Sequence, residues 1–274
     1  MTQYFSQRTL SQSISVSGTG VHSGKQTHLT IRPAPENHGI KFRRLDLPGT
    51  QDILALFKIV VDTSLATVLG TNGAIVSTIE HLMASFAGLG IDNALVEVDD
   101  YEIPIMDGSA KIFTHLIKKA GIIKQTAPKQ FFIVKKPVKV TDNDKSVIVY
   151  PEPCFKITCR IDFSHPLIGK QEITFDRAKN NFEKEISHAR TFGFIQDLEL
   201  LKKFSLGKGG SLDNAIIIDK DRILNADSLG DFSLLGMPIQ GHIVTHKSGH
   251  TLNHLFIKTF LENKDAWETG PAKI

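Results

Sequence analysis

The chain has little cysteine and no long apolar run, and both scarcities exclude classes of protein. Its 274 residues include two cysteines, Cys154 and Cys159, in a segment that alternates like a strand. No second Cys pair or neighbouring His accompanies them, which argues against a zinc knuckle, so we interpret them as buried thiols. The N-terminal residues lack the apolar core of a secretory signal, and no stretch is long and apolar enough to cross a bilayer. We therefore expect a cytoplasmic protein without a membrane span.

Charge of one sign is not concentrated anywhere in the sequence. The formal net charge of +3 comes from scattered residues, and no Lys/Arg run interleaved with aromatics suggests a nucleic-acid partner. A hydrophobic share of 41% and a charged share of 22% are typical of a globular protein with a substantial core. The small positive excess suits an anionic small molecule without requiring one.

Strand-like segments followed by helices occur twice along the chain. The first series ends in amphipathic segments near residues 77–88 and 110–120, and the second begins after a polar stretch, residues 122–130, that we interpret as a linker. Helical patterns return at residues 182–189 and 197–204. Strands followed by helices favour an α+β protein. We expect two similar α+β domains, residues 1–126 and 127–274, with a small-molecule cleft between them.

The stretch STIEHLMASFAG, residues 77–88, permits two interpretations. Ser77 and Glu80 have the spacing of a capping box, in which each side chain satisfies a free backbone N–H group at a helix start. Alternatively, Glu80 and His81 are half of a metal-hydrolase site. The glycine-rich GKGG at residues 207–210 lacks the P-loop pattern, so we interpret it as a tight turn.

Several short stretches occur together in one order: GTGVHSGK (18–25), TIEHLMASFAGLGIDNALVEV (78–98), EIPIMDGS (102–109), RIDFSHPLIG (160–169), HARTFGF (188–194), LGKGGSLDNAIIID (206–219) and KSGHTLN (247–253). That combination resembles the zinc-dependent UDP-3-O-acyl-N-acetylglucosamine deacetylases of lipid A biosynthesis in Gram-negative bacteria. The resemblance implies two α+β domains that enclose the active site, and hydrolysis of the N-acetyl group from a UDP-linked, acylated glucosamine.

The resemblance also implies roles for individual residues. Glu80 would be the general base that takes a proton from water, and His81 would be a ligand of the zinc cofactor. His250 would give a proton to the departing amine, and Thr191 would hydrogen-bond the developing oxyanion.

The same resemblance implies substrate-binding roles for further residues. Phe163 matches the position that stacks on uracil, and Lys145 the position near the diphosphate; a core aromatic and a solvated turn lysine are the alternatives. Phe192, Gly210 and Ser211 would line the passage for the acyl chain, and Asp197 would also contact the substrate.

One segment departs from the family pattern. An H-K-x-x-D helix, whose His and Asp complete the zinc site, should follow Leu229, yet Leu229 is followed directly by Gly230 and Asp231. Relative to the usual pattern about fifteen residues, a helix of about four turns, are absent. Asp231 matches the residue that orients the catalytic His, but His81 is the one zinc ligand left, and a catalytic zinc site has three protein ligands.

Other histidines are poor replacements for these ligands. His242, His246 and His250 are spaced by four, but GHIVTH is typical of a strand, where residues four apart lie about 13 Å apart. We interpret His242 and His246 as strand and surface residues. The gap should leave apolar side chains of NAIIID and FSLLG uncovered. We expect a monomer; the alternative function is an inactive relative that binds a nucleotide sugar or a protein partner.

Overall fold

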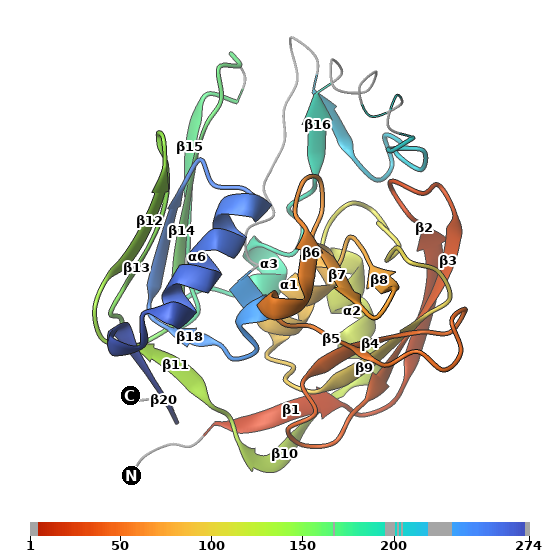
Figure 1. Cartoon of the computed structure of the whole chain (residues 1–274), viewed down its shortest axis with the longest axis horizontal. Coiled ribbons are helices and arrows are strands. Elements are labelled where there is room, and N and C mark those ends of the chain that lie inside the picture. The colour runs from red at the N-terminus through yellow and green to blue at the C-terminus, as the bar shows by residue number, and fades with distance from the viewer. Residues whose placement is uncertain are drawn as a thin grey trace.

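The computed structural model describes residues 5–166, 168–194, 201, 203, 205–218 and 232–271. Two five-stranded sheets lie on opposite sides of the molecule, with helices between them (Figure 1). This arrangement confirms the α+β class that the sequence predicted. No described helix is both long and apolar enough to cross a membrane.

The sheet of the first half has the strand order β2-β3-β9-β4-β5. Strands β9 and β4 run parallel, and every other neighbouring pair is antiparallel. The inward residues alternate along these strands, so that Leu29, Ile31 and Phe42 are buried. The strands are β2 (Ile14–Thr19), β3 (Gln26–Pro33), β4 (Ile40–Arg44), β5 (Ile53–Leu54) and β9 (Ala94–Val98).

The sheet of the second half repeats this topology with the order β12-β13-β19-β14-β15. Here β19 and β14 are the parallel pair, and the other neighbours are antiparallel. The two halves are therefore similar in strand order and direction, as the sequence predicted. The strands are β12 (Val138–Asp142), β13 (Lys145–Tyr150), β14 (Lys156–Asp162), β15 (Lys170–Asp176) and β19 (His242–His246).

Four α-helices are described: α1 (Glu80–Leu89), α2 (Lys111–Ala120), α3 (Phe182–Glu185) and α6 (His250–Glu262). Helix α2 confirms the amphipathic segment predicted at residues 110–120; it follows β9 and packs against β2. Helix α6 follows β19 and packs against β12 and β13. The helical pattern predicted at 197–204 falls mainly outside the described residues. One-turn 3-10 helices occupy Phe57–Ile59 (η1), Ser233–Leu235 (η3) and Lys264–Ala266 (η4).

The capping box predicted at the start of α1 is wrong. The helix begins at Glu80, its N-cap is Ile79, and no side chain caps it. Ser77 instead pairs through its backbone with Tyr101 and Ile103, and Thr78 has a φ of 61°. Because the chain between Ser77 and Ile79 is not helical, the Ser–Glu spacing does not span the first helical turn. The side chain of Glu80 is thus available for another contact.

The linker predicted at residues 122–130 is also wrong. Residues Ile122–Pro128 form β10, which pairs antiparallel with β1 (Ser6–Leu10) and runs between the two halves (Figure 1). Thr126, the predicted domain boundary, lies inside this strand. The remaining strands are β6 (Val60–Asp62), β7 (Val68–Thr71), β8 (Ala74–Val76), β11 (Phe131–Val134), β16 (Phe192–Phe194), β17 (Ile216–Ile218), β18 (Ile239–Gln240) and β20 (Trp267–Gly270).

Two expectations about burial need correction. Phe232, Leu234 and Leu235 of FSLLG are buried rather than uncovered, because η3 packs against α1 and the Phe232 ring contacts the ring of Phe256. Cys154 is exposed, since it lies in the turn before β14 and not in the alternating strand. In the second half, Ile173 on β15 is an exposed apolar side chain, at 49%.

Candidate active site

Glu80 and His250 meet between the two halves of the chain. Each is the first residue of a helix, Glu80 in α1 and His250 in α6. The Nε2 atom of His250 lies 3.7 Å from Oε1 of Glu80. Glu80 is 5% exposed and His250 has a side chain that is 23% exposed, so the pair is sheltered but reachable from solvent.

Thr67 lies against both members of this pair. Its backbone N–H donates to Oε1 of Glu80 at 2.9 Å, and its hydroxyl lies 3.5 Å from Nδ1 of His250. Thr67 is 2% exposed and precedes β7. Nothing in the sequence marks it as a site residue, because an isolated threonine before a strand carries no motif. The structure thus adds a residue that fixes the relative position of an acidic and a basic side chain.

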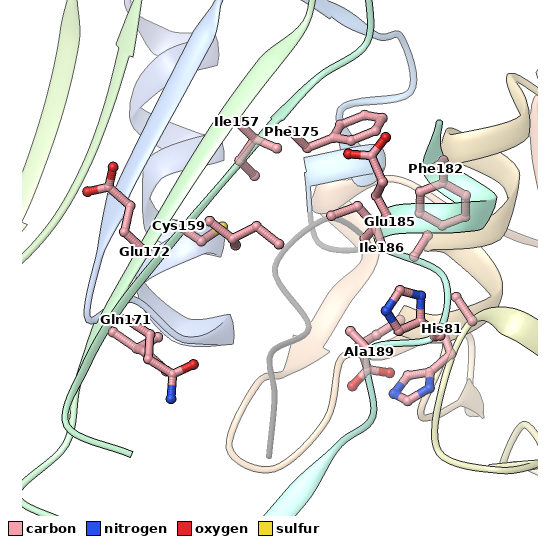
Figure 2. A pocket seen from close by; sticks show the side chains of 16 residues that line it. His81, Ile157, Cys159, Gln171, Glu172, Phe175, Phe182, Glu185, Ile186 and Ala189 are labelled. Carbon is pink, nitrogen blue, oxygen red and sulfur yellow. The ribbon is translucent and has the colours of Figure 1, made fainter. Parts of the chain in front are cut away.

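His81 is buried next to Glu80 and lines a cavity of about 320 Å³ between α1 and the second sheet. Figure 2 shows His81, Ala189 and Phe182 on one side of this space, and Ile157, Cys159 and Gln171 on the other. His188 and Glu185 also line it. The cavity is therefore mainly apolar on its sheet side, with Gln171 and Glu172 among its lining, and polar near the start of α1.

Thr191 is held by backbone hydrogen bonds from both halves. Its N–H donates to the carbonyl of Gly108 at 2.8 Å, and its own carbonyl accepts from the N–H of Ile216 at 3.0 Å. A side chain at Gly108 is excluded, since a Cβ there would lie 2.1 Å from the carbonyl oxygen of Asn214. Strand β16 begins directly after Thr191, so these contacts also place Phe192.

Arg190 connects the same region to the first half, although no motif in the sequence indicates this role. Its Nε donates to the carbonyl of Asp107 at 2.7 Å. Its Nη2 donates to the carbonyls of Leu212 and Asp213 at 3.3 and 2.6 Å. Because a guanidinium has several fixed donors, one side chain connects three backbone positions from two distant segments. Thr191 is thereby held in register with the loop at residues 107–109.

Phe163 and Phe192, which the sequence assigned to opposite ends of the substrate, lie in one aromatic cluster. Their ring centroids are 5.6 Å apart in an edge-to-face arrangement, and the Phe194 ring lies 5.9 Å from each of them. All three residues are partly exposed. The cluster offers ring faces and edges on which a planar or apolar group can pack.

Gly210 and Ser211 lie in the loop of residues 206–215, which docks on the loop of residues 20–24. The Gly209 N–H donates to the carbonyl of Val21 at 3.0 Å, and a Cβ at Gly209 would lie 2.2 Å from the carbonyl oxygen of Gly20. The Ser211 N–H donates to Oδ1 of Asn214 at 2.8 Å. GKGG therefore forms a turn, as predicted. The lack of a side chain at Gly209 permits the close approach of the two loop backbones.

Glu102 holds the loop of residues 20–24 in place through hydrogen bonds to its backbone. This fully buried carboxylate accepts the backbone N–H groups of His22 and Ser23 at 2.9 and 2.7 Å, and the hydroxyl of Thr78 at 3.1 Å. Burial lowers the pKa of His22, while the charge of Glu102 opposes that shift. The motif GTGVHSGK thus serves to position a loop that carries part of the site.

Lys145 is exposed at the start of β13, where the neighbouring Ser146 is paired with His246 at the end of β19. Phe163 follows β14, and His250 follows β19, at this same edge of the second sheet. Three predicted site residues therefore lie along one sheet edge. Asp197 and Asp231, and the junction after Leu229, lie outside the described residues.

Metal ligands are scarce around His81. All eleven histidines and both cysteines of the chain are among the described residues. Within the described ranges, no group of three His, Cys, Asp or Glu side chains could hold a metal ion. His242 and His246 lie at opposite ends of β19, as the strand interpretation requires, and Nε2 of His242 lies 3.0 Å from the hydroxyl of Thr158.

Curated relatives resemble the chain over almost its whole length. Proteins named UDP-3-O-acyl-N-acetylglucosamine deacetylase from Myxococcus xanthus and Idiomarina loihiensis are 47% and 46% identical to it; the alignments cover 98% and 96% of this chain, and 90% and 92% of the relatives. A protein of the same name from Syntrophus aciditrophicus is 43% identical, over 97% of this chain and 89% of its own length.

Each of these alignments has more positions than the number of residues of this chain that it contains. The alignment with the Myxococcus protein has 284 positions, whereas 98% of 274 residues is about 268. The Syntrophus alignment has 282 positions, whereas 97% of the chain is about 266. About 16 positions of each alignment therefore have no residue in this chain. The family model described as UDP-3-O-acyl N-acetylglycosamine deacetylase matches residues 7–262, and together with these identities it shows that the chain belongs to that family.

Proposed function

We propose that this protein hydrolyses the N-acetyl group of a UDP-3-O-(3-hydroxyacyl)-N-acetylglucosamine, which yields acetate and the free amine. The placement of Glu80 against His250 is the observation that supports this reaction best, in a chain whose relatives carry the name of that deacetylase. We further propose that the reaction is the committed step of lipid A synthesis, carried out by a monomer in the cytoplasm of a Gram-negative bacterium.

Amide hydrolysis needs a base for the attacking water and an acid for the departing nitrogen. Glu80 takes a proton from water while the water oxygen forms a bond to the acetyl carbon. His250 then donates a proton to the nitrogen as the carbon–nitrogen bond breaks, so the immediate products are acetic acid, which ionises to acetate in solvent, and the amine. Transfer of the proton from Glu80 to His250, 3.7 Å away, restores both groups. Thr67 holds Oε1 of Glu80 by a hydrogen bond from its backbone N–H, and its hydroxyl lies beside Nδ1 of His250.

The remaining predicted roles concern charge and orientation. The Thr191 hydroxyl stabilises the negative charge that develops on the acetyl oxygen, and the bonds to Gly108 and Ile216 support this role because they fix its backbone beforehand. Asp231 orients the imidazole of His250; this role rests on the sequence motif.

Substrate contacts follow the edge of the second sheet. Phe163 stacks on the uracil, and Lys145 neutralises part of the diphosphate charge. Phe192, whose ring packs against that of Phe163, lines the passage for the acyl chain. Gly210 and Ser211 border the acyl chain, and Asp197 contributes a further polar contact. The partial exposure of the aromatic cluster supports a ligand-binding role over a purely structural one.

The family resemblance implies a zinc cofactor, and the described residues do not fit one. His81 can supply one ligand, but a catalytic zinc site has three protein ligands, and the described part of the chain offers no such group. A single ligand cannot hold zinc tightly. No metal ion therefore takes part in the steps above. His81 would bind zinc only in a chain that also supplied the other ligands.

Acetate release from the UDP-linked substrate, followed by mass spectrometry of the amine product, tests the proposal. We expect Glu80-dependent release and, in parallel calorimetry, binding of UDP that weakens when Phe163 is replaced by Ala. Binding without any release would overturn the enzymatic proposal and support a protein that only binds the nucleotide sugar. Neither release nor binding would overturn both.

A further inference from the structure

Four basic side chains line a cavity of about 440 Å³ that is separate from the candidate active site. They come from different segments: Arg8 from β1, Lys124 from β10, Lys129 from the connection between β10 and β11, and Arg177 from the residues after β15. Among the described residues, none lines both this cavity and the one beside His81. The described lining also contains no Asp or Glu. The cavity is therefore a positively charged space, and it is large enough for a small molecule.

Arg8 and Lys124 lie opposite each other on two paired strands. Arg8 of β1 is the direct cross-strand partner of Lys124 of β10 in an antiparallel pair. The side chains of such partners leave the same face of the pair with Cβ atoms about 5 Å apart, so like charges there repel each other. Arg8 donates through Nη1 to the backbone carbonyl of Leu89 at 3.3 Å, which is a dipole and not a negative charge. An anion bound between the two side chains would replace this repulsion by attraction.

Lys129 and Arg177 meet Arg8 at the C-terminal end of α1. Nζ of Lys129 donates to the carbonyl of Gly90 at 3.1 Å, and Nη1 of Arg177 donates to the carbonyl of Ala87 at 3.3 Å. This end of a helix carries a partial negative charge of about half an elementary charge, which attracts cations. Capping of the helix accounts for one cation, but one helix end does not need three.

Asp92 is the acidic partner of this basic cluster. Its Oδ1 lies 3.0 Å from Nζ of Lys129, and its Oδ2 accepts the backbone N–H of Arg8 at 2.8 Å. Burial lowers the pKa of Lys129, Asp92 opposes that shift, and the charges of Arg177 and Arg8 add to it. Asp92 and the helix end together offset about one and a half of the four positive charges. An excess of about two and a half positive charges therefore remains around the cavity.

Aromatic side chains line the same cavity as the basic cluster. The rings of Phe5 and Phe131 lie edge to face with their centroids 6.0 Å apart, and Phe155 also lines the space. Phe5 is 42% exposed, so part of its surface is available to an apolar group. Cys154 and Arg177 are exposed, so a ligand can enter from solvent. The lining thus offers positive charge and apolar surface together.

We propose that this cavity is a second ligand site, which binds a small phosphate monoester that carries an apolar group. Arg8, Lys129 and Arg177 hold the phosphate, and the apolar group packs on Phe5 and Phe131. A phosphate monoester carries about −1.5 to −2 charges at pH 7, close to the excess of the cluster, and a guanidinium can bind it through two parallel hydrogen bonds. Because Arg8 belongs to the first half and Arg177 to the second, the bound ester also connects the two halves.

Calorimetry with hexyl phosphate tests the site. We expect a Kd below about 1 mM, binding of inorganic phosphate that is at least about tenfold weaker because it lacks the apolar group, and no binding of hexanol. Arg177→Gln should weaken the binding of hexyl phosphate at least about tenfold, and Lys124→Gln at least about threefold. Lys139→Gln is the matched control, because Lys139 is likewise exposed on a strand, β12, and lies outside the cavity.

Alkylation of cysteine locates the bound ester. Cys154 lines this cavity, whereas Cys159 lines the cavity beside His81. Hexyl phosphate at about ten times its Kd should slow the labelling of Cys154 by uncharged iodoacetamide at least about threefold, and should leave the labelling of Cys159 unchanged, as followed by peptide mass spectrometry. Protection of Cys159 alone would overturn the proposal. Equally tight binding by Lys124→Gln and the unaltered chain would also overturn it, and this criterion holds if Arg177→Gln does not fold.

Vesicles distinguish two sources of the same chemistry. Sedimentation with phosphatidylcholine vesicles that contain phosphatidic acid tests whether the ester is a lipid headgroup. Vesicle binding that Lys124→Gln weakens would support the site with a membrane lipid as its ligand, and hexyl phosphate binding without vesicle binding would support it with a soluble ester. Inorganic phosphate that binds as tightly as hexyl phosphate would overturn the proposal and indicate an adventitious ion only. None of these measurements uses turnover, so their outcome is independent of the deacetylase assay.

Discussion

The imidazole Nε2 of His250 lies 3.7 Å from the carboxylate Oε1 of Glu80, and Thr67 contacts that same oxygen through its backbone N–H and the other ring nitrogen of His250 through its hydroxyl. The two residues come from equivalent ends of helices in different halves of the chain. Neither half alone therefore contains both members of the acid–base pair. Docking of the halves, rather than either motif, creates the arrangement that hydrolysis needs.

Glu80→Gln should separate catalysis from stability. The amide keeps the size of the side chain and can still accept the Thr67 N–H, but it cannot take a proton from water. We expect acetate release to fall by about two to four orders of magnitude, while the free energy of unfolding changes by less than about 1 kcal/mol. Turnover measured by mass spectrometry and urea unfolding provide the two readouts.

Glu172→Gln is the control for that substitution. Glu172 lines the same cavity but is exposed and paired with Arg160. It should leave turnover almost unchanged. An equal loss of turnover in both variants, or a Glu80→Gln chain that loses stability in proportion to its activity, would contradict the role of Glu80 as base.

Arg190→Ala should loosen the loop of residues 206–215. The substitution removes donors to the carbonyls of Asp107, Leu212 and Asp213, so the loop loses one of its connections to the first half. Hydrogen exchange of amides 209–214 should become at least about tenfold faster. Arg43→Ala is the matched control, since Arg43 makes two hydrogen bonds to Asp52 within the first half. Similar acceleration in both variants would argue against a specific connection.

Gly88 marks the contact between α1 and α3. A Cβ at this position would lie 2.2 Å from the Phe182 ring. Alanine gains about 1 kcal/mol of helix propensity over glycine, but overpacking a rigid ring costs about 1–3 kcal/mol. We therefore expect Gly88→Ala to lower the free energy of unfolding, as measured in urea. In a Phe182→Ala background the same substitution should be neutral or stabilising, and Gly193→Ala, which meets open space, should not show this dependence.

The sequence predicted the strands and amphipathic helices well because their patterns are local. Alternation in the second sheet and the helical face of residues 110–120 follow directly from which side chains are buried. The strand β10 escaped prediction because it is exposed on most positions, and its partner β1 is more than a hundred residues away. A pattern of burial cannot reveal a strand that buries little.

The site was predictable only where a motif carries it. Glu80, His81 and His250 came from short motifs, and the structure brings Glu80 and His250 together. Thr67 acts through its hydroxyl and its backbone N–H. Arg190 acts through hydrogen bonds from its guanidinium to backbone carbonyl oxygens. Such contacts depend on the position of the other half of the chain, and nothing in the neighbouring sequence of either residue reports that position.

His22 should make stability depend on pH. Burial lowers the pKa of His22 below its usual 6.5, so between the lowered value and 6.5 the unfolded chain binds more protons than the folded chain. Stability is therefore lost as the pH falls through this window. Burial also lowers the pKa of His242, which adds a change of the same sign. Urea unfolding of His22→Gln at about pH 7.5 and 5.5 should show a smaller loss than the unaltered chain. Exposed His115→Gln serves as the control, and an unchanged loss in His22→Gln would contradict the assignment.

Zinc content should follow the missing helix rather than His81 alone. The described residues offer His81 without two further ligands, so the purified chain should retain well below one zinc ion after dialysis, measured by inductively coupled plasma mass spectrometry. Insertion of the relatives' segment after Leu229 should raise the content toward one ion, and His81→Ala in that inserted chain should lower it again. His115→Ala, an exposed histidine on α2, should not. One ion retained by the unaltered chain and lost with His81→Ala would show that other residues complete the site, because tight binding needs several ligands that act together.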